Sequence, residues 1–450
     1  MSVFSMLSVP PYHFKGGNDY VVAWGLYKFG PVKNISKDVI DSRIFYVTSA
    51  GKKDYHCKLV RRLSESLVKG LKHPECGTLS FYGFENYFKK RLNLNHIEVV
   101  VSDLNDPKDV SAHVTDAVSQ NPADIPLIVL PEHPKELSAN HYYYTKTMLF
   151  LKGIFITQVV LYETLIEVKK LCSSLLPISL QIFTKLGGIP YTIAKPIGGK
   201  GYKTLLIGVG LSKLQSNNDL EQYMGVVSVF ASDGTFKYID YSLTEVNRDR
   251  LAKSLEQSIR SAIGKLRREG MLAPDENLWI IVHYSGKEMS GEEERAIVKT
   301  CKELSQEMST LLEPSIIKIT DNNIYRVFNT QYKYYPVIGS YVELVPMKLY
   351  ILNTLGYDVS KKGPLRKEMP NSLLISIKKA QSSLIQELLY SVLAMARVNF
   401  SAAQLMYLRP ATISYPRKAT KLLSRSIHIA RHLDGSLSLE LIERDKLWFI

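Results

Sequence analysis

The segment that decides the fold contains three consecutive strand-like stretches: TLLIGVGLS (Thr204–Ser212), GVVSVFAS (Gly225–Ser232) and TFKYIDYS (Thr235–Ser242). Runs of β-branched, aromatic and aliphatic residues bounded by turn residues are typical of strands. A helical pattern follows at Glu245–Arg268, and then a fourth strand pattern, LWIIVHYS, at Leu278–Ser285. The short connections predict three antiparallel strands, after which a helix returns the chain to a parallel fourth strand.

The sequence beyond the fourth strand extends this order. Ser290 followed three residues later by Glu293 is the signature of a capping box and predicts another helix. Three antiparallel strands, a helix and then parallel strand–helix units form the order of an RNase H-like fold. A Gly-rich stretch before the first strand, Ile197–Gly201, lacks the GxxxxGK[ST] pattern of a phosphate loop. We therefore expect it to be a hairpin turn between two strands.

The N-terminal half alternates strand and helix patterns. Strands are expected at Arg43–Ala50, His96–Asp103 and Ile125–Pro131, and helices at Lys58–Gly70, Phe84–Leu92 and Lys108–Ser119. Strands separated by helices predict a parallel, doubly wound sheet in an α/β protein. Ligands on such sheets bind outside the carboxyl ends of the strands, so we expect a site between Tyr142 and Gln158. A domain boundary is expected near Gly187, Gly188 and Pro190.

Charge indicates the kind of partner. Lysine and arginine exceed aspartate and glutamate by 57 to 43, a formal net charge of +14, which favours a polyanionic partner. Two long segments contain no acidic residue: Val168–Asn218, with seven lysines, and Leu388–Leu433, with seven lysines and arginines. Such segments are typical of surfaces that follow nucleic-acid phosphates, although the solvated face of a basic protein has the same pattern.

Other features exclude several classes of protein. The four cysteines lie far apart without metal-binding spacing, so we expect neither a zinc site nor a disulfide framework. Their sparseness favours a reducing, cytoplasmic setting. The N-terminus lacks the pattern of a signal peptide. The most apolar stretch, Met148–Val168, carries three charged residues and is expected to be buried core rather than a membrane span.

A set of polar residues has the chemistry of a pocket for a terminal phosphate. Tyr142 and Lys146 are four residues apart on one face of an expected helix; Gln158 follows, and Lys185 opens the sequence KLGG. A terminal phosphate carries more charge than an internal one, so convergent lysines and an amide can distinguish a strand's end from its middle. Tyr142 offers a ring on which the first base can stack. The alternative is that Tyr142 is one of three consecutive tyrosines and that Lys146 is simply exposed.

These features resemble the Argonaute family. The spaced Tyr, Lys, Gln and Lys resemble the pocket for the guide 5′-phosphate in the MID domain, and KLGG resembles the junction from MID to PIWI. The C-terminal stretch Arg409–Leu423 (RPATISYPRKATKLL) and the final LWFI resemble the end of a PIWI domain. The resemblance implies an N-terminal segment 1–30, a Rossmann-like MID domain 31–188 and an RNase H-like PIWI domain 189–450. It implies a short family member without N or PAZ domains, because fewer than 200 residues precede KLGG.

One position departs from the family pattern. Many members have a second lysine four residues before the lysine of KLGG, where this chain has Gln181. The lost charge leaves room for a divalent cation, which in several prokaryotic relatives bridges the guide phosphates with help from the C-terminal carboxylate. The resemblance therefore implies Mg²⁺ or another divalent cation bound by Gln158 and the terminal carboxylate of Ile450. The alternative is that LWFI is a hydrophobic plug with a solvated carboxylate.

The resemblance also identifies where active PIWI domains place the carboxylates that hold two metal ions. Gly210 stands where an aspartate lies on the first strand, and Ser285 stands where another follows the fourth strand. Arg417 stands at the last acidic or histidine position. None of these groups can bind Mg²⁺, so we expect no catalytic residues and no cleavage. Glu256 is a weak match to the remaining glutamate. The alternative is a shifted strand register that uses one of three other acids: Asp233, Asp240 or Glu288.

The resemblance implies a protein that holds a short guide strand by its 5′-phosphate and recognises complementary RNA or DNA without cutting it. Such proteins work in prokaryotic defence with a protein partner that supplies the rest of the channel and an effector activity. Two other functions stay open from the sequence: an active RNase H-like nuclease with another carboxylate set, and a sequence-tolerant single-strand binder. The choice between RNA and DNA depends on contacts to 2′-hydroxyl groups, which the sequence does not locate.

Overall fold

The computed structural model describes residues 4–131, 140–198, 201–214, 222–245, 248–273, 276–285, 291–359, 363–364, 369–400, 409–433 and 435–450. The chain forms two compact units. Unit 1 comprises residues 1–11, 192–399 and 404–421, and unit 2 comprises 12–191, 400–403 and 422–450. These units are not the same divisions as the expected domains, because each unit includes a segment from the far end of the chain.

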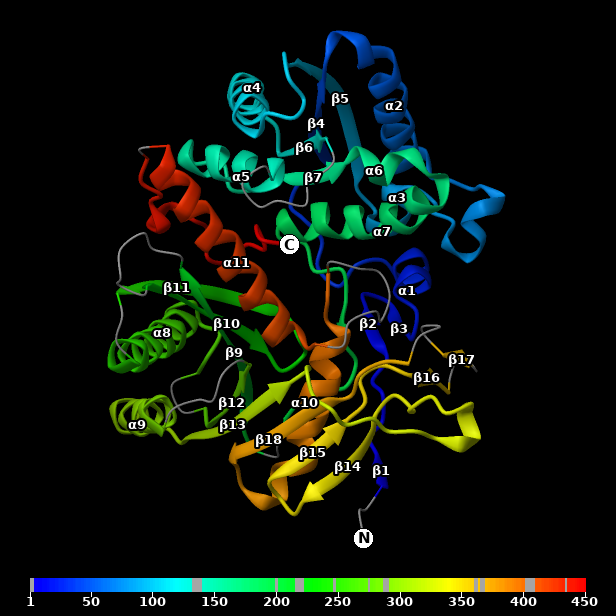
Figure 1. The fold of residues 1–450 in the computed structure, drawn as a ribbon. Helices are drawn as coiled ribbons and strands as arrows, with labels where there is room; N and C mark the ends of the chain where they lie inside the picture. Colours follow the sequence, from blue (N-terminus) through cyan, green and yellow to red (C-terminus); the bar gives the residue numbers. More distant parts are fainter. Residues whose placement is uncertain are drawn as a thin grey trace. The chain divides into compact units, whose positions relative to one another are not determined.

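Unit 2 is built on a four-stranded sheet in which all neighbouring strands are parallel (Figure 1). The strands, in sheet order, are β5 (Arg91–Val100), β4 (Val39–Thr48), β6 (Ile125–Leu130) and β7 (Gln158–Leu161). Its helices are α1 (Val22–Phe29), α2 (Lys53–Lys69), α3 (Phe84–Phe88), α4 (Pro107–Gln120), α5 (His141–Leu151), α6 (Tyr162–Ile166) and α7 (Val168–Lys185). Two short strands, β2 (Tyr12–Phe14) and β3 (Gly17–Asp19), pair antiparallel.

The three strands and the parallel sheet expected in this half are confirmed. Apolar side chains of β4, β5 and β6 pack with those of α4 and α5 in one buried cluster, which fixes α5 on the sheet. The helix expected at Phe84–Leu92 is too long: α3 ends at Phe88, and β5 begins at Arg91. Lys89, with φ +56°, ends the helix in the left-handed region, so the chain turns directly into the strand.

Unit 1 contains a nine-stranded mixed sheet in the order β1-β14-β15-β18-β13-β12-β9-β10-β11 (Figure 1). The strands are β1 (Phe4–Met6), β9 (Lys203–Leu214), β10 (Gln222–Ala231), β11 (Phe236–Glu245), β12 (Leu278–Tyr284), β13 (Leu312–Thr320), β14 (Ser340–Val345), β15 (Leu349–Leu352) and β18 (Leu373–Lys379). Short strands outside this sheet are β8 (Thr192–Ile193), β16 (Tyr357–Asp358) and β17 (Gly363–Pro364).

The strand order expected around Thr204–Ser285 is confirmed. β9, β10 and β11 are antiparallel neighbours, and β12 is parallel to both β9 and β13. Helix α8 (Arg248–Arg268) connects β11 to β12, and α9 (Gly291–Met308) connects β12 to β13. The capping residue expected at Ser290 lies outside the described residues.

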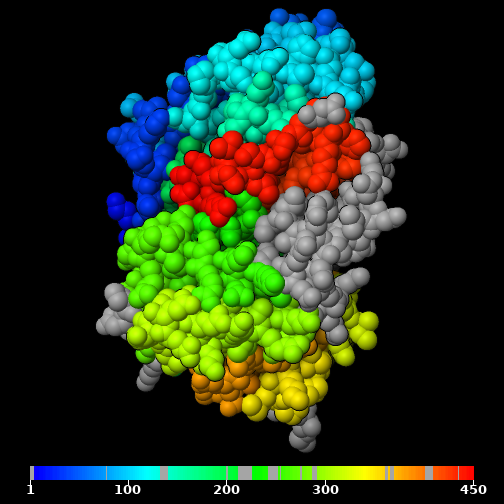
Figure 2. All heavy atoms as spheres, turned by 90° about the vertical axis from the view of Figure 1, so that its left-hand side faces the viewer, coloured from blue at the N-terminus to red at the C-terminus, as the bar shows by residue number. Residues whose placement is uncertain are grey.

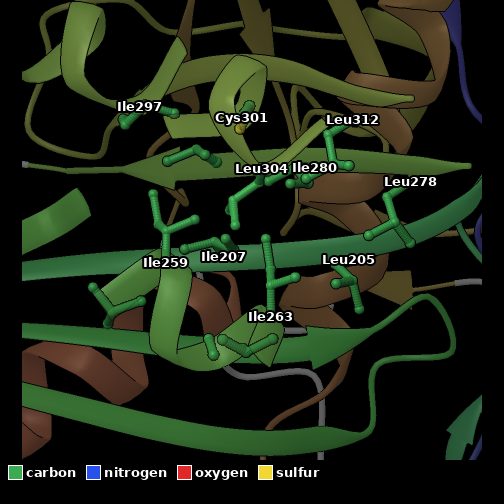
Figure 3. Packing of buried hydrophobic residues seen from close by; sticks show 14 of the residues in the cluster. Leu205, Ile207, Ile259, Ile263, Leu278, Ile280, Ile297, Cys301, Leu304 and Leu312 are labelled. Atoms are coloured by element: carbon green, nitrogen blue, oxygen red, sulfur yellow. The ribbon is translucent and has the colours of Figure 1, made fainter. Parts of the chain in front are cut away.

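The two faces of this sheet carry different helices. Leu205, Ile207 and other alternate residues of β9 and β12 pack against α8 and α9, where Ile259 and Ile263 project from α8 (Figure 3). The other alternate residues face α10 (Ile385–Arg397) and the first half of α11 (Ala411–His432). On that face, a buried histidine of β12, His283, bonds through its two ring nitrogens to Ser391 of α10 and Thr412 of α11.

Two expectations about local structure are wrong. Strand β9 pairs with β10 and β12 and not with the preceding strand β8, so the two do not form the expected hairpin; residues 199 and 200 of the expected turn lie outside the described residues. Cys76 and Cys172 form a disulfide with Cα atoms 5.5 Å apart, although 96 residues separate them in sequence. The fold brings together the 3-10 segment Pro74–Leu79 and helix α7, and no sequence spacing indicates this pairing. Within the described part of the chain, no helix is long and apolar enough to cross a membrane.

Candidate nucleic-acid interface

Two buried lysines of unit 2 converge on one backbone oxygen. The Nζ atom of Lys146 donates to the carbonyl oxygen of Thr157 at 3.2 Å and to its Oγ1 at 2.7 Å. The Nζ atom of Lys185 donates to the same carbonyl oxygen at 3.0 Å and to Oε1 of Gln158 at 2.8 Å. Each lysine is only 2% exposed. Three of the four predicted pocket residues therefore lie together around Thr157.

Helix α5 positions Lys146. Asn140 caps the helix, and its Oδ1 accepts hydrogen bonds from the backbone N–H groups of Tyr142 and Tyr143. Tyr142 lies one turn before Lys146 and is half-buried, with its ring edge-to-face against Tyr143 at 5.2 Å. Burial raises the pKa of the Tyr142 hydroxyl. The ring of Tyr142 is thus on the helix that carries Lys146, and base stacking on it stays a prediction.

Helix α7 positions Lys185, its last residue. The KLGG sequence ends this helix: Gly187 has φ +89°, and its N–H donates to the carbonyl oxygen of Thr184. A side chain at Gly188 would lie 2.3 Å from the ring of Phe183, so glycine is needed for this close approach. The two glycines therefore stop α7 at the residue whose ammonium enters the pocket.

The pocket lies at the start of β7, not at the carboxyl ends of the strands where we expected it. Gln158 is the first residue of β7 and pairs in register with Leu127, near the start of β6. The helices run back along the sheet, so the last residue of α7 meets the beginning of a strand rather than its end. The expected stretch, Tyr142 to Gln158, does supply Lys146 and Gln158, but the direction of the helices places them at the other edge of the sheet from the one where ligands usually bind. Ligand binding there stays a prediction.

The contacts of Gln158 and Gln181 decide whether their side chains can bind the predicted cation. Nε2 of Gln158 donates to Oε1 of Gln181 at 3.0 Å, and its own Oε1 accepts from Lys185. The side-chain oxygen of Gln158 is thus bonded to the ammonium group of Lys185, and the buried ammonium group of Lys146 lies close by. These protein groups alone do not fit a divalent cation, which needs several free oxygen ligands. The carboxylate of half-buried Ile450 stays a predicted ligand only.

Burial controls the charge of the pocket. It lowers the pKa of Lys146 to about 7, because the charged ammonium loses its hydration. An ammonium has three donors, and the described residues supply acceptors to Lys146 for two of them, both from Thr157. An anion that enters the pocket would supply the missing charge and acceptor. Two other lysines of the acid-free segment Val168–Asn218 differ from this pair, because Lys170 and Lys203 form ion pairs with glutamates on the surface.

The predicted nuclease positions lie in unit 1. Gly210 of β9 packs against α11: an added Cβ would lie 2.7 Å from Cβ of Pro416 and 2.9 Å from its carbonyl carbon. Arg417 is exposed and lies 3.8 Å from the carboxylate of Asp321. Ser285 is half-buried after β12. Gly210 is therefore a point of close contact between a strand and a helix.

The other acids considered from the sequence are placed as follows. Oδ1 of Asp233 accepts from the backbone of Thr235 in the turn between β10 and β11, as expected for a turn residue. Asp240 is buried in β11. Glu256 lies on α8, which packs on the sheet face opposite to α11, and pairs with Arg260 at 3.5 Å. Glu288 lies outside the described residues.

Helices α8 and α9 form the outer surface of unit 1 in the view of Figure 2. A groove of about 940 Å³ runs between them and is lined by acids and bases of both helices, among them Glu256, Glu292 and Lys299. Within the described part of the chain, no three His, Cys, Asp or Glu side chains gather as a metal site. The groove is therefore a mixed-charge surface on the face away from Gly210.

Sequence reasoning missed Thr157, the residue that joins the two lysines. Its main contribution is a backbone carbonyl oxygen, which any residue supplies, so the sequence carries no signal for it. It also missed the direct bond between Gln158 and Gln181, which occupies the place of the absent second lysine.

The two α/β units and the buried lysine pair define a basic α/β protein with a pocket suited to an anion. A family model described as the Piwi domain matches residues 127–428, which is more than half of the chain. The chain therefore belongs to the Argonaute/Piwi family.

Individual relatives agree with this assignment. The protein argonaute of Cereibacter sphaeroides (strain ATCC 17025 / ATH 2.4.3) is 26% identical over 148 residues, which is 32% of this chain and 18% of that protein. The crystal structure of Drosophila Piwi is similar with a TM-score of 0.66 at 16% identity, and that of Aa-Ago with externally bound siRNA with 0.63 at 18%. Each structural match covers 99% of this chain and 56% of the other, and shows likeness of fold.

The low pKa of Lys146 predicts a pH-dependent stability. Below about pH 7, Lys146 is charged in both the folded and unfolded states; between pH 7 and its unfolded pKa near 10.4, only the unfolded state binds the proton. The stability that Lys146 contributes is thus lost as pH falls toward 7. Urea unfolding of the wild type and Lys146→Met should show a difference in unfolding free energy that rises with pH by up to about 1.4 kcal/mol per unit. Parallel curves from pH 6.5 to 9 would contradict the assignment.

Proposed function

We propose that this protein binds the 5′-phosphate of a short guide strand in the pocket of Lys146 and Lys185 and recognises complementary nucleic acid through that guide. The observation that carries the proposal is the convergence of both ammonium groups on the carbonyl oxygen of Thr157. A dianionic phosphate beside two buried lysines gains charge-assisted hydrogen bonds and offsets the cost of burying their charge. The family assignment supports it, and one structural relative was solved with externally bound siRNA.

We propose that the two sheets belong to two domains of different kind. The parallel sheet of unit 2, with its lysine pocket, corresponds to a Rossmann-like MID domain in residues 31–188. The antiparallel β9–β11 followed by α8 and parallel β12 corresponds to an RNase H-like PIWI domain in residues 189–450. We propose that these two domains together form a MID–PIWI pair.

We further propose that the guided target is bound without cleavage. An aspartate at position 210 would have to displace Pro416 and the start of the next turn of α11. His283 supports the same interpretation: burial lowers its pKa to about 3, and its ring nitrogens bond to Thr412 and Ser391. It is a neutral residue that joins two helices to the sheet rather than a metal ligand or proton carrier. A nuclease would need another set of carboxylates.

Recognition without cleavage requires that another component act on the result. We therefore propose a protein partner that completes the nucleic-acid channel and carries an effector activity, in prokaryotic defence against invading nucleic acid. The support for this step is the family assignment.

A 5′-phosphate should be preferred over a 5′-hydroxyl on an otherwise identical short strand. We expect at least about tenfold tighter binding at fixed salt, because each hydrogen bond to a charged group contributes about 1.5–3 kcal/mol. Lys146→Ala and Lys185→Ala should each remove the preference. Fluorescence anisotropy with both strands, in Mg²⁺ and in EDTA, measures this directly, and loss of the preference in EDTA would support the divalent cation.

The matched control is Lys152→Ala, because Lys152 is an exposed lysine directly after α5 and outside the pocket. It should lower the affinities for both strands equally, if at all. Equal binding of the two strands by the wild type would leave a sequence-tolerant single-strand binder and contradict the guide pocket.

Substitution at Gly210 should fail to create a nuclease. We predict that Gly210→Asp lowers the free energy of unfolding by about 1–3 kcal/mol through overpacking against Pro416. The triple variant Gly210→Asp, Ser285→Asp, Arg417→Asp should not cut guide-paired target in Mg²⁺ or Mn²⁺. Gly264→Ala is the control, since its nearest neighbour is a side-chain atom at 3.5 Å. Metal-dependent cutting by the wild type would overturn the proposal, and a Gly210→Asp protein as stable as the wild type would contradict the packing argument.

A further inference from the structure

A cluster of aromatic side chains lies on the surface of unit 2 over helix α1 and the segment before α3. Trp24 is 55% exposed and Tyr27 is 41% exposed, on the outer face of α1. Their rings are 6.3 Å apart, and the half-buried Tyr82 lies 6.3 Å from Trp24 and 5.2 Å from Tyr27. We call Trp24, Tyr27 and Tyr82 the aromatic platform. Exposed tryptophan and tyrosine in contact with one another are unusual on a surface that binds nothing.

Lysines border the platform. The Nζ atom of Lys72 lies 5.0 Å from the centre of the Tyr82 ring, and that of Lys89 lies 5.9 Å from the centre of the Tyr27 ring. Both lysines are exposed. Among the cation–ring contacts of the described residues, none involves Trp24, so the indole is the ring most open to a partner. The two segments that form this surface, residues 15–30 and 69–91, contain seven lysines and arginines against three acids.

The platform rests on a rigid base. Tyr27 contacts the buried ring of Tyr87 at 6.2 Å, and Phe88 of the same helix stacks on Phe183 of α7 at 4.6 Å. On the inner face of α1, Gly25 allows the ring of Phe14 to approach so closely that an added Cβ would lie 2.0 Å from it. The exposed rings are thus held in place before any partner arrives, which lowers the entropy cost of binding.

We propose that the aromatic platform is a second binding site for single-stranded nucleic acid, at which a base stacks on Trp24 while Lys72 and Lys89 contact the adjacent phosphates. Aromatic rings beside exposed cations are the arrangement by which proteins bind single strands without sequence preference. The positive balance of the two segments favours a polyanion over a protein surface with an apolar centre. The site needs no 5′-phosphate, because none of its groups belongs to the pocket around Thr157.

Tryptophan fluorescence isolates this site. The chain has three tryptophans, and Trp279 and Trp448 are 1% and 0% exposed, so Trp24 is the one in contact with solvent. A short oligothymidine with a 5′-hydroxyl should quench the Trp24 emission. The same strand with a 3′-fluorophore gives the affinity by anisotropy, at fixed low salt because binding of phosphates is salt-dependent. The full chain is used throughout.

Trp24→Ala should weaken binding of the 5′-hydroxyl strand by about fivefold or more, as expected for the loss of one stacked base. Trp24→Phe keeps an aromatic face and should bind within about threefold of the wild type, and Lys72→Ala should weaken binding and reduce its salt dependence. The matched control is Tyr55→Ala, which removes a 51% exposed tyrosine on α2, away from the platform. Tyr55→Ala should leave the affinity for the 5′-hydroxyl strand unchanged. Melting curves test whether each variant is folded.

The outcomes separate this site from the pocket. Quenching by the 5′-hydroxyl strand with affinity lost in Trp24→Ala and kept in Lys146→Ala supports the platform, whatever the result for the 5′-phosphate. Equal affinity in folded Trp24→Ala and wild type overturns it and leaves a protein as the occupant to be sought. Equal binding of the 5′-phosphate and 5′-hydroxyl strands by the wild type would count against the pocket and not against the platform.

Discussion

Two buried lysines bonded to one carbonyl oxygen are the constraint on which the function proposed for this protein depends. Lys146 and Lys185 come from different helices, and both are buried at Thr157, where water cannot hydrate them. Such a pair is costly without an anion, which is why burial lowers the pKa of Lys146 to about 7. The cap at the start of α5 and the glycines at the end of α7 place the two lysines beside each other. The pocket is therefore most stable when an anion occupies it.

In unit 1, a position where the family resemblance predicts a nuclease residue is used for packing. Because Gly210 has no side chain, Pro416 of α11 can lie directly on β9. His283 on the neighbouring strand is hydrogen-bonded to the same helix. In our proposal, the space that a pair of metal ions would need on this face is used for packing between a helix and a sheet. In our proposal, guide binding thus follows from the burial of two lysines in unit 2, and the absence of cleavage follows from close packing at Gly210 in unit 1.

Much of the fold could be predicted because its signals are local. The strands at Thr204–Ser212 and Leu278–Ser285 have long apolar runs, and strand–helix alternation is sufficient to predict the parallel sheet of unit 2. Lys146, Gln158 and Lys185 could be named because lysines and an amide suit a terminal phosphate and because their spacing resembles that of the Argonaute family. Thr157 could not, since it acts through its backbone, and neither could the Cys76–Cys172 disulfide, since only the folded chain brings its ends together. The close approach at Gly210 depends on a helix some 200 residues further along the chain.

The most direct test of the central claim is the number of protons taken up when the strand binds. At pH 8, Lys146 is largely neutral in the free protein, and a phosphate beside it should raise its pKa. Titration calorimetry in buffers of different ionisation enthalpy should show uptake approaching about one proton for a 5′-phosphorylated strand and about none for its 5′-hydroxyl counterpart. Equal proton uptake for the two strands would contradict the account, because the phosphate would then not bind beside Lys146.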